Sequence, residues 1–224
     1  MSAPRLAIIA GPNGSGKTTL TRQLLADGFD FGNYINPDDI AARLDGDYDE
    51  RVRRAQKIAD ELRERFIAEG RDFAFETVMS HESKLEVMRH AREAGFHLTL
   101  FFVATEDSRI NVARVEARVR RGGHSVPHDR IIARYARTMS SLVDAMLIVD
   151  RTVLFDNSWL LGSLRPCAEI IVKRASASAP ASVRSARRLA RLPLWVKSAL
   201  LCLAERLPVD DSGAQLLRSF AGSD

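Results

Sequence analysis

A run of eight residues near the N-terminus has the composition and spacing of a phosphate-binding loop. Residues 11–18 read Gly-Pro-Asn-Gly-Ser-Gly-Lys-Thr, which fits a glycine, four residues and then Gly-Lys-Ser/Thr. The glycines let the backbone wrap a phosphate with its amides pointing inward, Lys17 can reach the outer phosphates, and the Thr18 hydroxyl can ligate Mg²⁺. The loop therefore predicts binding of a nucleoside triphosphate. The expected nucleotide-binding residues are Gly11, Pro12, Asn13, Gly14, Ser15, Gly16, Lys17, Thr18 and Thr19.

The segments on either side of this loop have the order that phosphate binding requires. Residues 6–10 form an apolar run typical of a fully buried strand, and residues 19–26 indicate a helix that Gly28 ends. A helix that starts directly after the loop adds partial positive charge where a phosphate would lie. The alternative is a glycine-rich turn that binds nothing. The register of strand, loop, Lys-Thr and helix argues against that alternative.

Strands and helices are expected to alternate along most of the remaining chain. The expected strands are residues 34–36, 71–75, 97–103 and 152–155, with an edge strand at 168–172. The expected helices are residues 38–44, 50–68, 83–94, 111–121 and 128–149. This alternation predicts an α/β fold, a three-layer, doubly wound, mainly parallel sheet with helices on both faces. Ligands of such sheets bind beyond the carboxyl ends of the strands.

Two adjacent acids follow the expected strand 34–36. Asn36 and Pro37 indicate a helix cap followed by a proline at the first helical position, so Asp38 and Asp39 begin the next helix. Phosphoryl transfer needs a group that accepts the acceptor's proton, and either acid is a candidate. Acids in the first turn of a helix also interact favourably with its dipole, which is the structural alternative. We expect Asp38 to be the base, since Asn36-Pro37 would place it nearest the strand end.

Polar residues also follow the expected strand 71–75. Glu76 and Thr77 stand at its carboxyl end, where they could hold a hydroxyl-rich acceptor. Their alternative role is to cap the helix that begins near Ser83. Because the strand end points at the site, we favour substrate contact for Glu76 and Thr77, together with Asn36.

Arginines crowd the expected helical pair around Gly122-Gly123. They are Arg114, Arg118, Arg120, Arg121, Arg130, Arg134 and Arg137. A charge run is most often a solvated helix face, which accounts for several of them. A loop rich in arginine facing a phosphate loop can also neutralise a transferring phosphoryl group, and the glycine pair supplies a hinge for closure. We expect Arg118, Arg121 and Arg134 to be the catalytic arginines of such a lid.

Three further polar residues have structural and functional interpretations. Asp156 follows the expected strand 152–155 and either orders Mg²⁺ or caps the strand. His124 and His128 are expected to be turn residues, because no Cys or Glu completes a metal-binding set around them.

Length and composition indicate one ordinary α/β domain with an appendage. The chain has 224 residues, 46% of them hydrophobic, which is enough for a substantial core. Cys167 and Cys202 have neither metal-like nor redox-like spacing and suggest a reducing compartment. No apolar segment approaches the roughly 20 residues needed to cross a bilayer. We therefore expect a cytoplasmic protein.

Charge and composition divide the chain near its C-terminus. The residues from Lys173 onward carry nine Lys/Arg against four Asp/Glu, whereas the whole chain has a net charge of +4. The body is thus nearly neutral, which argues against a broad nucleic-acid footprint. We expect a catalytic domain at 1–175, a low-complexity linker at 176–182 and a helical tail at 183–224.

Two helices are expected in this tail, a basic one at 183–192 and an apolar one at 195–207. A basic helix followed by an apolar one could lie in an anionic membrane interface. Packing of the apolar helix on the body or on another chain is the favoured alternative.

Five segments in order give the chain a resemblance to a known family. GPNGSGKTT, INPDDIA, FETVMS, RVEARVRRGGHSVP with RYAR, and VLFDNS resemble the zeta toxin-like kinases over roughly residues 6–172. These are P-loop proteins whose best-known members phosphorylate UDP-N-acetylglucosamine on the sugar and so poison cell-wall synthesis. The lid sequence GGHSVP is closer to that of the small chromosomal members, which leaves the acceptor and toxicity open. The resemblance likewise leaves open an antitoxin partner.

The resemblance implies a role for each part of the predicted site. Lys17 and Thr18 would bind ATP and Mg²⁺, and Asp38 would be the general base toward the acceptor hydroxyl. Glu76 and Thr77 would lie in the acceptor pocket, with lid arginines clamping the transferring phosphate.

Three functions are compatible with these features. The first is a small-molecule kinase that uses ATP and Mg²⁺ on a hydroxyl, with UDP-N-acetylglucosamine as the first acceptor to test. The second is a polynucleotide or nucleoside kinase, which the neutral body disfavours and the basic tail favours. The third is a non-catalytic ATP-binding module that contacts a partner or a membrane through its tail. An intact Asp38 and an arginine lid favour an enzyme.

Lys17→Ala is expected to abolish phosphotransfer and to leave the fold intact, because the lysine should meet phosphates and not the core. ATP turnover and circular dichroism measured on the same preparation check this. Full activity in a folded Lys17→Ala protein would contradict the phosphate-loop assignment.

Overall fold

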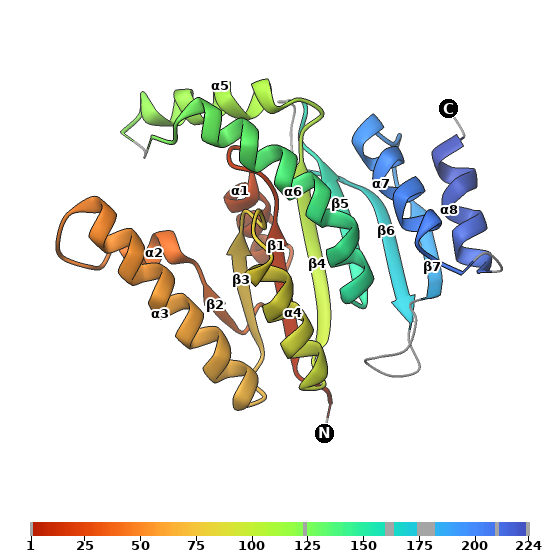
Figure 1. Ribbon diagram of the computed structural model, residues 1–224, viewed down its shortest axis with the longest axis horizontal. Helices are drawn as coiled ribbons and strands as arrows, with labels where there is room; N and C mark the ends of the chain where they lie inside the picture. The colour runs from red at the N-terminus through yellow and green to blue at the C-terminus, as the bar shows by residue number, and fades with distance from the viewer. Residues whose placement is uncertain (1, 123–124, 160–163, 174–181, 209–210, 223–224) are drawn as a thin grey trace.

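The computed structural model describes residues 2–122, 125–159, 164–173, 182–208 and 211–222. Seven strands form one sheet in the order β2-β3-β1-β4-β5-β6-β7 (Figure 1). The strands are β1 (Arg5–Ala10), β2 (Asn33–Ile35), β3 (Phe73–Thr77), β4 (His97–Ala104), β5 (Arg151–Asp156), β6 (Pro166–Lys173) and β7 (Ser182–Arg188). The helices are α1 (Lys17–Ala26), α2 (Pro37–Ala41), α3 (Tyr48–Ala68), α4 (Ser83–Glu93), α5 (Ser108–Val119), α6 (His128–Ile148), α7 (Leu194–Glu205) and α8 (Ser212–Gly222).

The sheet is parallel from β2 to β5 and antiparallel from β5 to β7. Parallel neighbours require crossover connections, which here are the helices between successive strands. All carboxyl ends of the parallel strands therefore lie at one edge of the sheet, where the phosphate loop follows β1. The predicted α/β fold with a mainly parallel, doubly wound sheet is confirmed.

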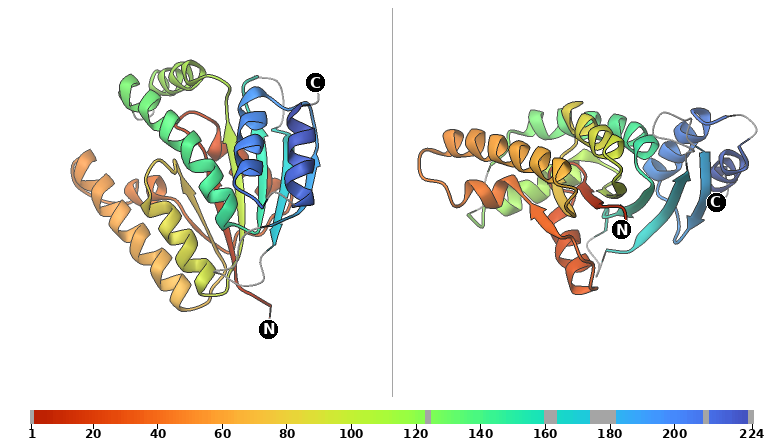
Figure 2. Two further views of the ribbon diagram at one scale, coloured as in Figure 1. Left: turned by 45° about the vertical axis from the view of Figure 1, so that its right-hand side comes forward. Right: turned by 90° about the horizontal axis from the view of Figure 1, so that it is seen from below.

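Alternation along β1 divides the core into two apolar layers. Leu6 and Ile8 face the layer under α3, α4, α6 and α7, whereas Ala7 and Ile9 face the layer under α1. Both layers are closed to solvent, which explains why β1 is apolar at successive positions instead of alternating with polar residues. The view from below shows most helices on one side of the sheet and α1 on the other (Figure 2).

The basic helix expected at 183–192 is wrong, because most of this segment is strand β7. It pairs antiparallel with β6, so that Ala186 lies opposite Ile170. Val183 and Ala186 are buried, while Arg184 and Arg187 are exposed. The arginine spacing also suits a helix. As a strand, however, the segment gives hydrogen-bond partners to the backbone N–H and C=O groups of β6, which an edge strand would leave unpaired. For the same reason β6 is not the edge strand that the sequence suggested.

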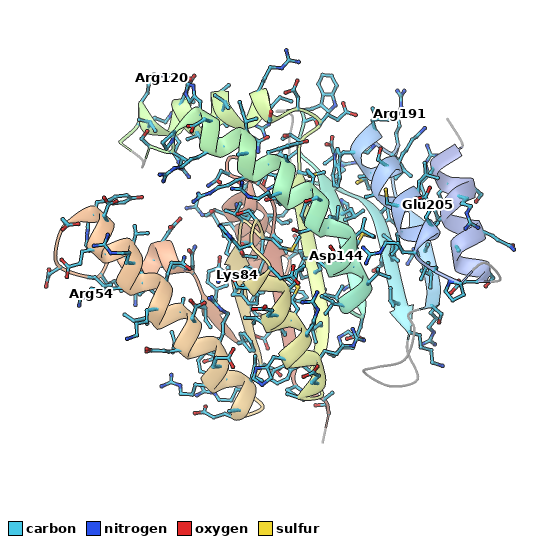
Figure 3. The ribbon with its side chains drawn as sticks, in the orientation of Figure 1. Arg54, Lys84, Arg120, Asp144, Arg191 and Glu205 are labelled. Carbon is cyan, nitrogen blue, oxygen red and sulfur yellow. The ribbon has the colours of Figure 1, made fainter. Side chains whose placement is uncertain are left out.

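The apolar helix expected at 195–207 is α7, and it packs on the body of the protein. Trp195, Val196 and Leu203 are buried in the core layer that also covers β4. An ion pair of 2.6 Å joins Arg206 to Asp144 of α6, which Figure 3 labels on the side of α6 toward α7. Packing on the body is therefore the observed role of this apolar face. No described helix is long and apolar enough to cross a membrane.

The ends of the tail differ from the expectation in two ways. The expected linker 176–182 lies outside the described residues except for Ser182, which begins β7. Helix α8 has no counterpart among the expected elements. Its first turn is held by Asp211, whose carboxylate accepts from the amides of Val183 and Gly213 at 3.1 Å and 2.7 Å. This contact joins the start of α8 to the start of β7.

Gly213→Ala is expected to destabilise the protein, because the new Cβ would lie 2.5 Å from the carbonyl oxygen of Val183. Overpacking against backbone costs about 1–3 kcal/mol of the free energy of unfolding. Gly222→Ala in the same helix is the matched control, since its Cβ would meet nothing within 4 Å. Urea unfolding measures both variants. Equal stability of the two would show that α8 does not pack against β7 this closely.

Candidate active site

The phosphate loop is built from glycines that no other residue could replace. Gly11, Gly14 and Gly16 have φ angles of 152°, 75° and 104°, in the region that favours glycine. A Cβ on Gly11 would lie 2.0 Å from the carbonyl oxygen of Val103, and one on Gly16 would lie 2.4 Å from Nδ2 of Asn157. The loop backbone therefore packs directly on the ends of β4 and β5.

Two asparagines hold this loop in place. Asn157, directly after β5, donates from Nδ2 to the carbonyl oxygen of Ser15 at 2.8 Å. Asn111 of α5 donates to the carbonyl oxygen of Asn13 at 2.6 Å. The hydroxyl of Ser15 is buried and has no hydrogen-bond partner among the described residues. A buried polar atom without a partner is costly, so the loop has an orphaned group of the kind that a bound phosphate can satisfy.

Lys17 is the centre of a group of charges that comes from three other elements. Its ammonium donates to the carbonyl oxygens of Gly11 and Pro12 at 3.0 Å and 3.1 Å. Burial lowers the pKa of Lys17, the carboxylates of Glu76 and Asp38 raise it, and the charge of Arg118 lowers it. The charges of residues from β3, α2 and α5 thus act on the lysine of the phosphate loop. Direct contact of these side chains at the strand ends stays a prediction.

Glu76 lies beside the entry to the loop. It is opposite Ile9 in the pairing of β3 with β1, and its Oε2 accepts from the Tyr34 hydroxyl at 3.0 Å. Burial raises the pKa of Glu76, while the Lys17 charge and the Tyr34 hydrogen bond lower it. Burial and the Glu76 charge in turn raise the pKa of Tyr34. Tyr34 is a site residue that the sequence did not single out, since a tyrosine in a short strand is an ordinary core signal.

The structure distinguishes the two adjacent acids of α2. Asn36 caps this helix by accepting from the Asp38 amide at 3.0 Å, which orients the first turn. The charge of Asp38 acts on both Lys17 and Glu76. Asp39 also raises the pKa of Glu76, but it is not among the groups that perturb Lys17. The choice of Asp38 as base and substrate contact by Asn36 stay predictions.

Thr77 shapes the turn that follows β3. Its hydroxyl accepts from the Met79 amide at 3.0 Å, and Met79 has a positive φ of 56° although it is not a glycine. Thr138 of α6 donates to the carbonyl oxygen of Val78 at 2.8 Å and so fixes the same turn. A buried residue held in a left-handed conformation costs free energy and persists only where its surroundings determine it. Contact of Thr77 with an acceptor stays a prediction.

The predicted lid is a pair of helices, α5 and α6, that lies above the phosphate loop (Figure 1). Among its described residues, Arg118 is the arginine whose charge acts on Lys17. Arg121 is exposed just after α5, and Arg134 is half-buried in α6. Gly123 of the expected hinge and His124, expected to be a turn residue, lie outside the described residues. Catalytic roles for all three arginines stay predictions.

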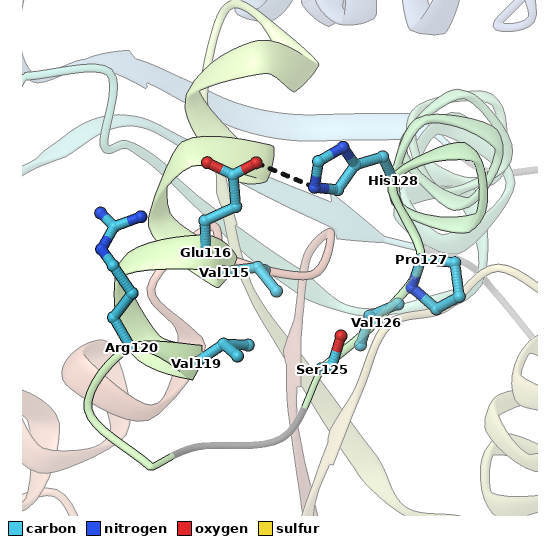
Figure 4. A pocket seen from close by; sticks show the side chains of 8 residues that line it. All are labelled: Val115, Glu116, Val119, Arg120, Ser125, Val126, Pro127 and His128. Atoms are coloured by element: carbon cyan, nitrogen blue, oxygen red, sulfur yellow. Dashed lines mark ion pairs between the residues drawn. The ribbon is translucent and has the colours of Figure 1, made fainter.

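A cavity of about 430 Å³ opens between the two lid helices (Figure 4). Val115 and Val119 of α5 and Pro127 line its apolar part. At its rim His128 and Glu116 form an ion pair of 2.9 Å. His128, expected in a turn, is instead the first residue of α6 and joins it to α5. The described residues contain no cluster of three or more metal-binding side chains.

Asp156 is engaged by neighbouring side chains. Its Oδ1 accepts from the indole N–H of Trp195 at 3.0 Å and from the Ser158 hydroxyl at 2.7 Å. This favours the capping interpretation of Asp156. Thr18 is an exposed residue in the first turn of α1.

Comparison with known proteins identifies the family of the chain. The family model AAA_33, an AAA domain, matches residues 6–142. The chain belongs to this family. An uncharacterized protein of Haemophilus influenzae is 34% identical over 131 residues, which are 56% of this chain and 88% of that protein.

Two solved structures share the fold of this AAA_33 protein. A chain of the PezAT chromosomal toxin–antitoxin system of Streptococcus pneumoniae gives a TM-score of 0.50 at 16% identity, over 70% of this chain and 69% of that one. The AvrRxo1-ORF1:-ORF2 structure with ATP gives a TM-score of 0.57 at 15% identity, over 97% of this chain and 75% of that one. The resemblance to zeta toxin-like P-loop kinases is thereby confirmed for the fold. The second likeness extends through the C-terminal part of the AAA_33 protein.

Asp38→Asn is expected to leave ATP binding near normal and to reduce turnover roughly a hundredfold or more, the usual scale for a positioned base. Asp39→Asn in the same helical turn is the matched control and should have the smaller effect. Steady-state turnover and ATP titration measure both. A larger loss in Asp39→Asn would reverse the choice, and two active variants would make both acids structural.

Glu76→Gln is expected to change how stability depends on pH. Because the pKa of Glu76 is raised, the folded protein binds a proton there more tightly than the unfolded chain. Stability therefore falls as pH rises from about 4.3, the ordinary value, through the raised pKa. Glu76→Gln lacks this loss and should gain stability relative to wild type over that range. Urea unfolding at several pH values measures it, with exposed Glu93→Gln as control. Parallel curves for wild type and Glu76→Gln would contradict a raised pKa.

Proposed function

We propose that this protein is an ATP-dependent phosphotransferase of the zeta toxin type that phosphorylates a hydroxyl of a small molecule. The observation that carries the proposal is a phosphate loop packed on the strand ends, whose Lys17 lies on its carbonyl oxygens and feels the charges of Glu76, Asp38 and Arg118. Phosphoryl transfer is catalysed mainly by positioning and by fixed charges of this kind. The proposed setting is the cytoplasm.

The loop residues fit the proposed cofactors. The phosphates of ATP would be bound by the backbone amides of Gly14 and Gly16 and by the Lys17 ammonium. They would also give the buried Ser15 hydroxyl a hydrogen-bond partner. The hydroxyl of Thr18, an exposed residue, suits Mg²⁺, which keeps several waters and takes few ligands from a protein when it is bound to phosphates. The metal would supply neutralisation of the phosphate charge.

The acceptor would lie on the β2–β3 side of the loop. There Asp38 would take the proton of the acceptor hydroxyl at a carboxylate oxygen. Glu76, held by Tyr34, would orient that hydroxyl, because its second oxygen is not used in the hydrogen bond to Tyr34. Arg118, with Arg121 and Arg134 of the lid, would stabilise the charge that develops as the phosphoryl group moves. Closure of α5 and α6 would exclude water from this reaction.

UDP-N-acetylglucosamine is the proposed first acceptor, on the strength of the family resemblance. The proposal also includes a protein partner of the antitoxin kind. Its support is that the similar structures come from a toxin–antitoxin system and from a complex of two open reading frames.

The test measures ATP consumption with Mg²⁺ and one of four additions: UDP-N-acetylglucosamine, a nucleoside, a 5′-hydroxyl oligonucleotide or buffer. Mass spectrometry then identifies the phosphorylated product, and Lys17→Ala is the control for contaminating activity. We expect UDP-N-acetylglucosamine to gain one phosphate. Phosphorylation of the oligonucleotide or nucleoside alone would instead support a polynucleotide or nucleoside kinase. ATP binding without any consumption would support a non-catalytic module.

A further inference from the structure

The first turn of α7 is hydrogen-bonded to the end of β5. The indole N–H of Trp195 donates to Oδ1 of Asp156 at 3.0 Å, although the two residues are 39 positions apart. Trp195 is only 8% exposed, and the centre of its ring lies 5.9 Å from that of Phe102 in β4. Asp156 also accepts from the Ser158 hydroxyl at 2.7 Å. Its carboxylate therefore joins a C-terminal helix to the loop after β5.

A second connection runs beside the first. The amide of Leu194, which starts α7, donates to Oε1 of Glu106 at 3.0 Å. Such an amide has no partner inside its own helix, so this side chain satisfies it. The Glu106 amide donates to the Ser158 hydroxyl at 2.9 Å. The segments after β4 and β5 are thus tied to each other and to the start of α7.

Asn157 lies in the sequence between Asp156, which accepts from Trp195, and Ser158, which accepts from the Glu106 amide. Its amide donates to the carbonyl oxygen of Ala104 at 2.8 Å, and its side chain donates to the carbonyl oxygen of Ser15 at 2.8 Å. The closeness of Asn157 to Gly16 leaves no room for a Cβ there. A shift of residues 156–158 would therefore move the Ser15 carbonyl and turn the neighbouring loop amides away from a phosphate.

We propose that Trp195 is a positioning residue for the phosphate loop, acting through Asp156 and Asn157. Its indole N–H holds the loop after β5 in the place from which Asn157 orients the Ser15 carbonyl. The inference rests on the proposed nucleotide site, and it assigns to the C-terminal segment a part in ATP binding.

The test is the affinity of the full chain for ATP and for inorganic triphosphate, measured by titration calorimetry. Trp195→Phe keeps an aromatic ring in the core and removes the N–H donor. We expect this substitution to lower the affinity for both ligands about fivefold to tenfold, the scale of one hydrogen bond. The effects on the two ligands should be equal, because the proposed path leads to the phosphates. If only ATP bound more weakly, the proposed path would be overturned, because the lost affinity would then come from contacts with the nucleoside.

Val196→Ala is the matched control for packing. Val196 is fully buried in the same helical turn, so its truncation should lower the unfolding temperature. It should leave the affinity for triphosphate unchanged. Equal losses of affinity in Val196→Ala and Trp195→Phe would overturn the proposal, because Trp195 would then act only through general stability.

A double-mutant cycle tests the path through Asn157. Asn157→Ala alone should weaken triphosphate binding at least as much as Trp195→Phe, and the double variant should be no weaker than Asn157→Ala. Fully additive effects would overturn the proposed path. If Trp195→Phe does not fold, Glu106→Ala replaces it, since Glu106 is exposed and still holds Leu194. An unchanged affinity in Glu106→Ala would then count against the proposal.

These measurements separate the inference from the proposed kinase activity. Failure to phosphorylate any acceptor would overturn the kinase proposal and leave the binding comparison intact. A wild-type protein that binds neither ATP nor triphosphate would overturn the nucleotide site and the role of Trp195 together.

Discussion

The phosphate loop packs with its backbone directly on the ends of β4 and β5, and this close approach fixes where the rest of the site can lie. Gly11 meets the carbonyl of Val103, and Gly16 meets the side chain of Asn157, at distances that exclude a Cβ. The loop can take this shape only when β1, β4 and β5 are paired in register. The conformation of the phosphate loop therefore depends on the pairing of the parallel strands whose ends it packs against.

Lys17 and Glu76 are charged side chains beside the phosphate loop, and burial disfavours the charged form of each. Burial lowers the pKa of Lys17 and raises the pKa of Glu76, so each charged form is disfavoured by its surroundings and favoured by the other. Arg118 adds a second positive charge near Lys17. An anion bound between Lys17 and Arg118 would reduce their repulsion. The site is thus arranged electrostatically for a ligand with several negative charges.

The C-terminal segment is part of the same folded unit as the phosphate loop. Strand β7 extends the sheet beyond β6, and α7 fills the core layer over β4 with Trp195 and Leu203. The antiparallel pair β6–β7 needs no crossover helix, so both strands can be added at the edge of a parallel sheet by short connections. Docking of α7 then brings the Trp195 indole to Asp156, beside the asparagine that binds the phosphate loop.

The sequence by itself determined the features whose signals are local. The glycine spacing, Lys17 and the apolar run before them predicted the loop, and Asn36-Pro37 predicted the cap that orients Asp38. Alternating strands and helices predicted the α/β fold, because each element carries its own periodicity. Only the tertiary structure decided that residues 182–188 form a strand, since their arginine spacing suits a helix and pairing with β6 overrides it. The roles of Asn111, Asn157 and Trp195 were decided in the same way. Their partners lie 98, 142 and 39 positions away, and a local pattern does not encode a contact that depends on how distant elements pack.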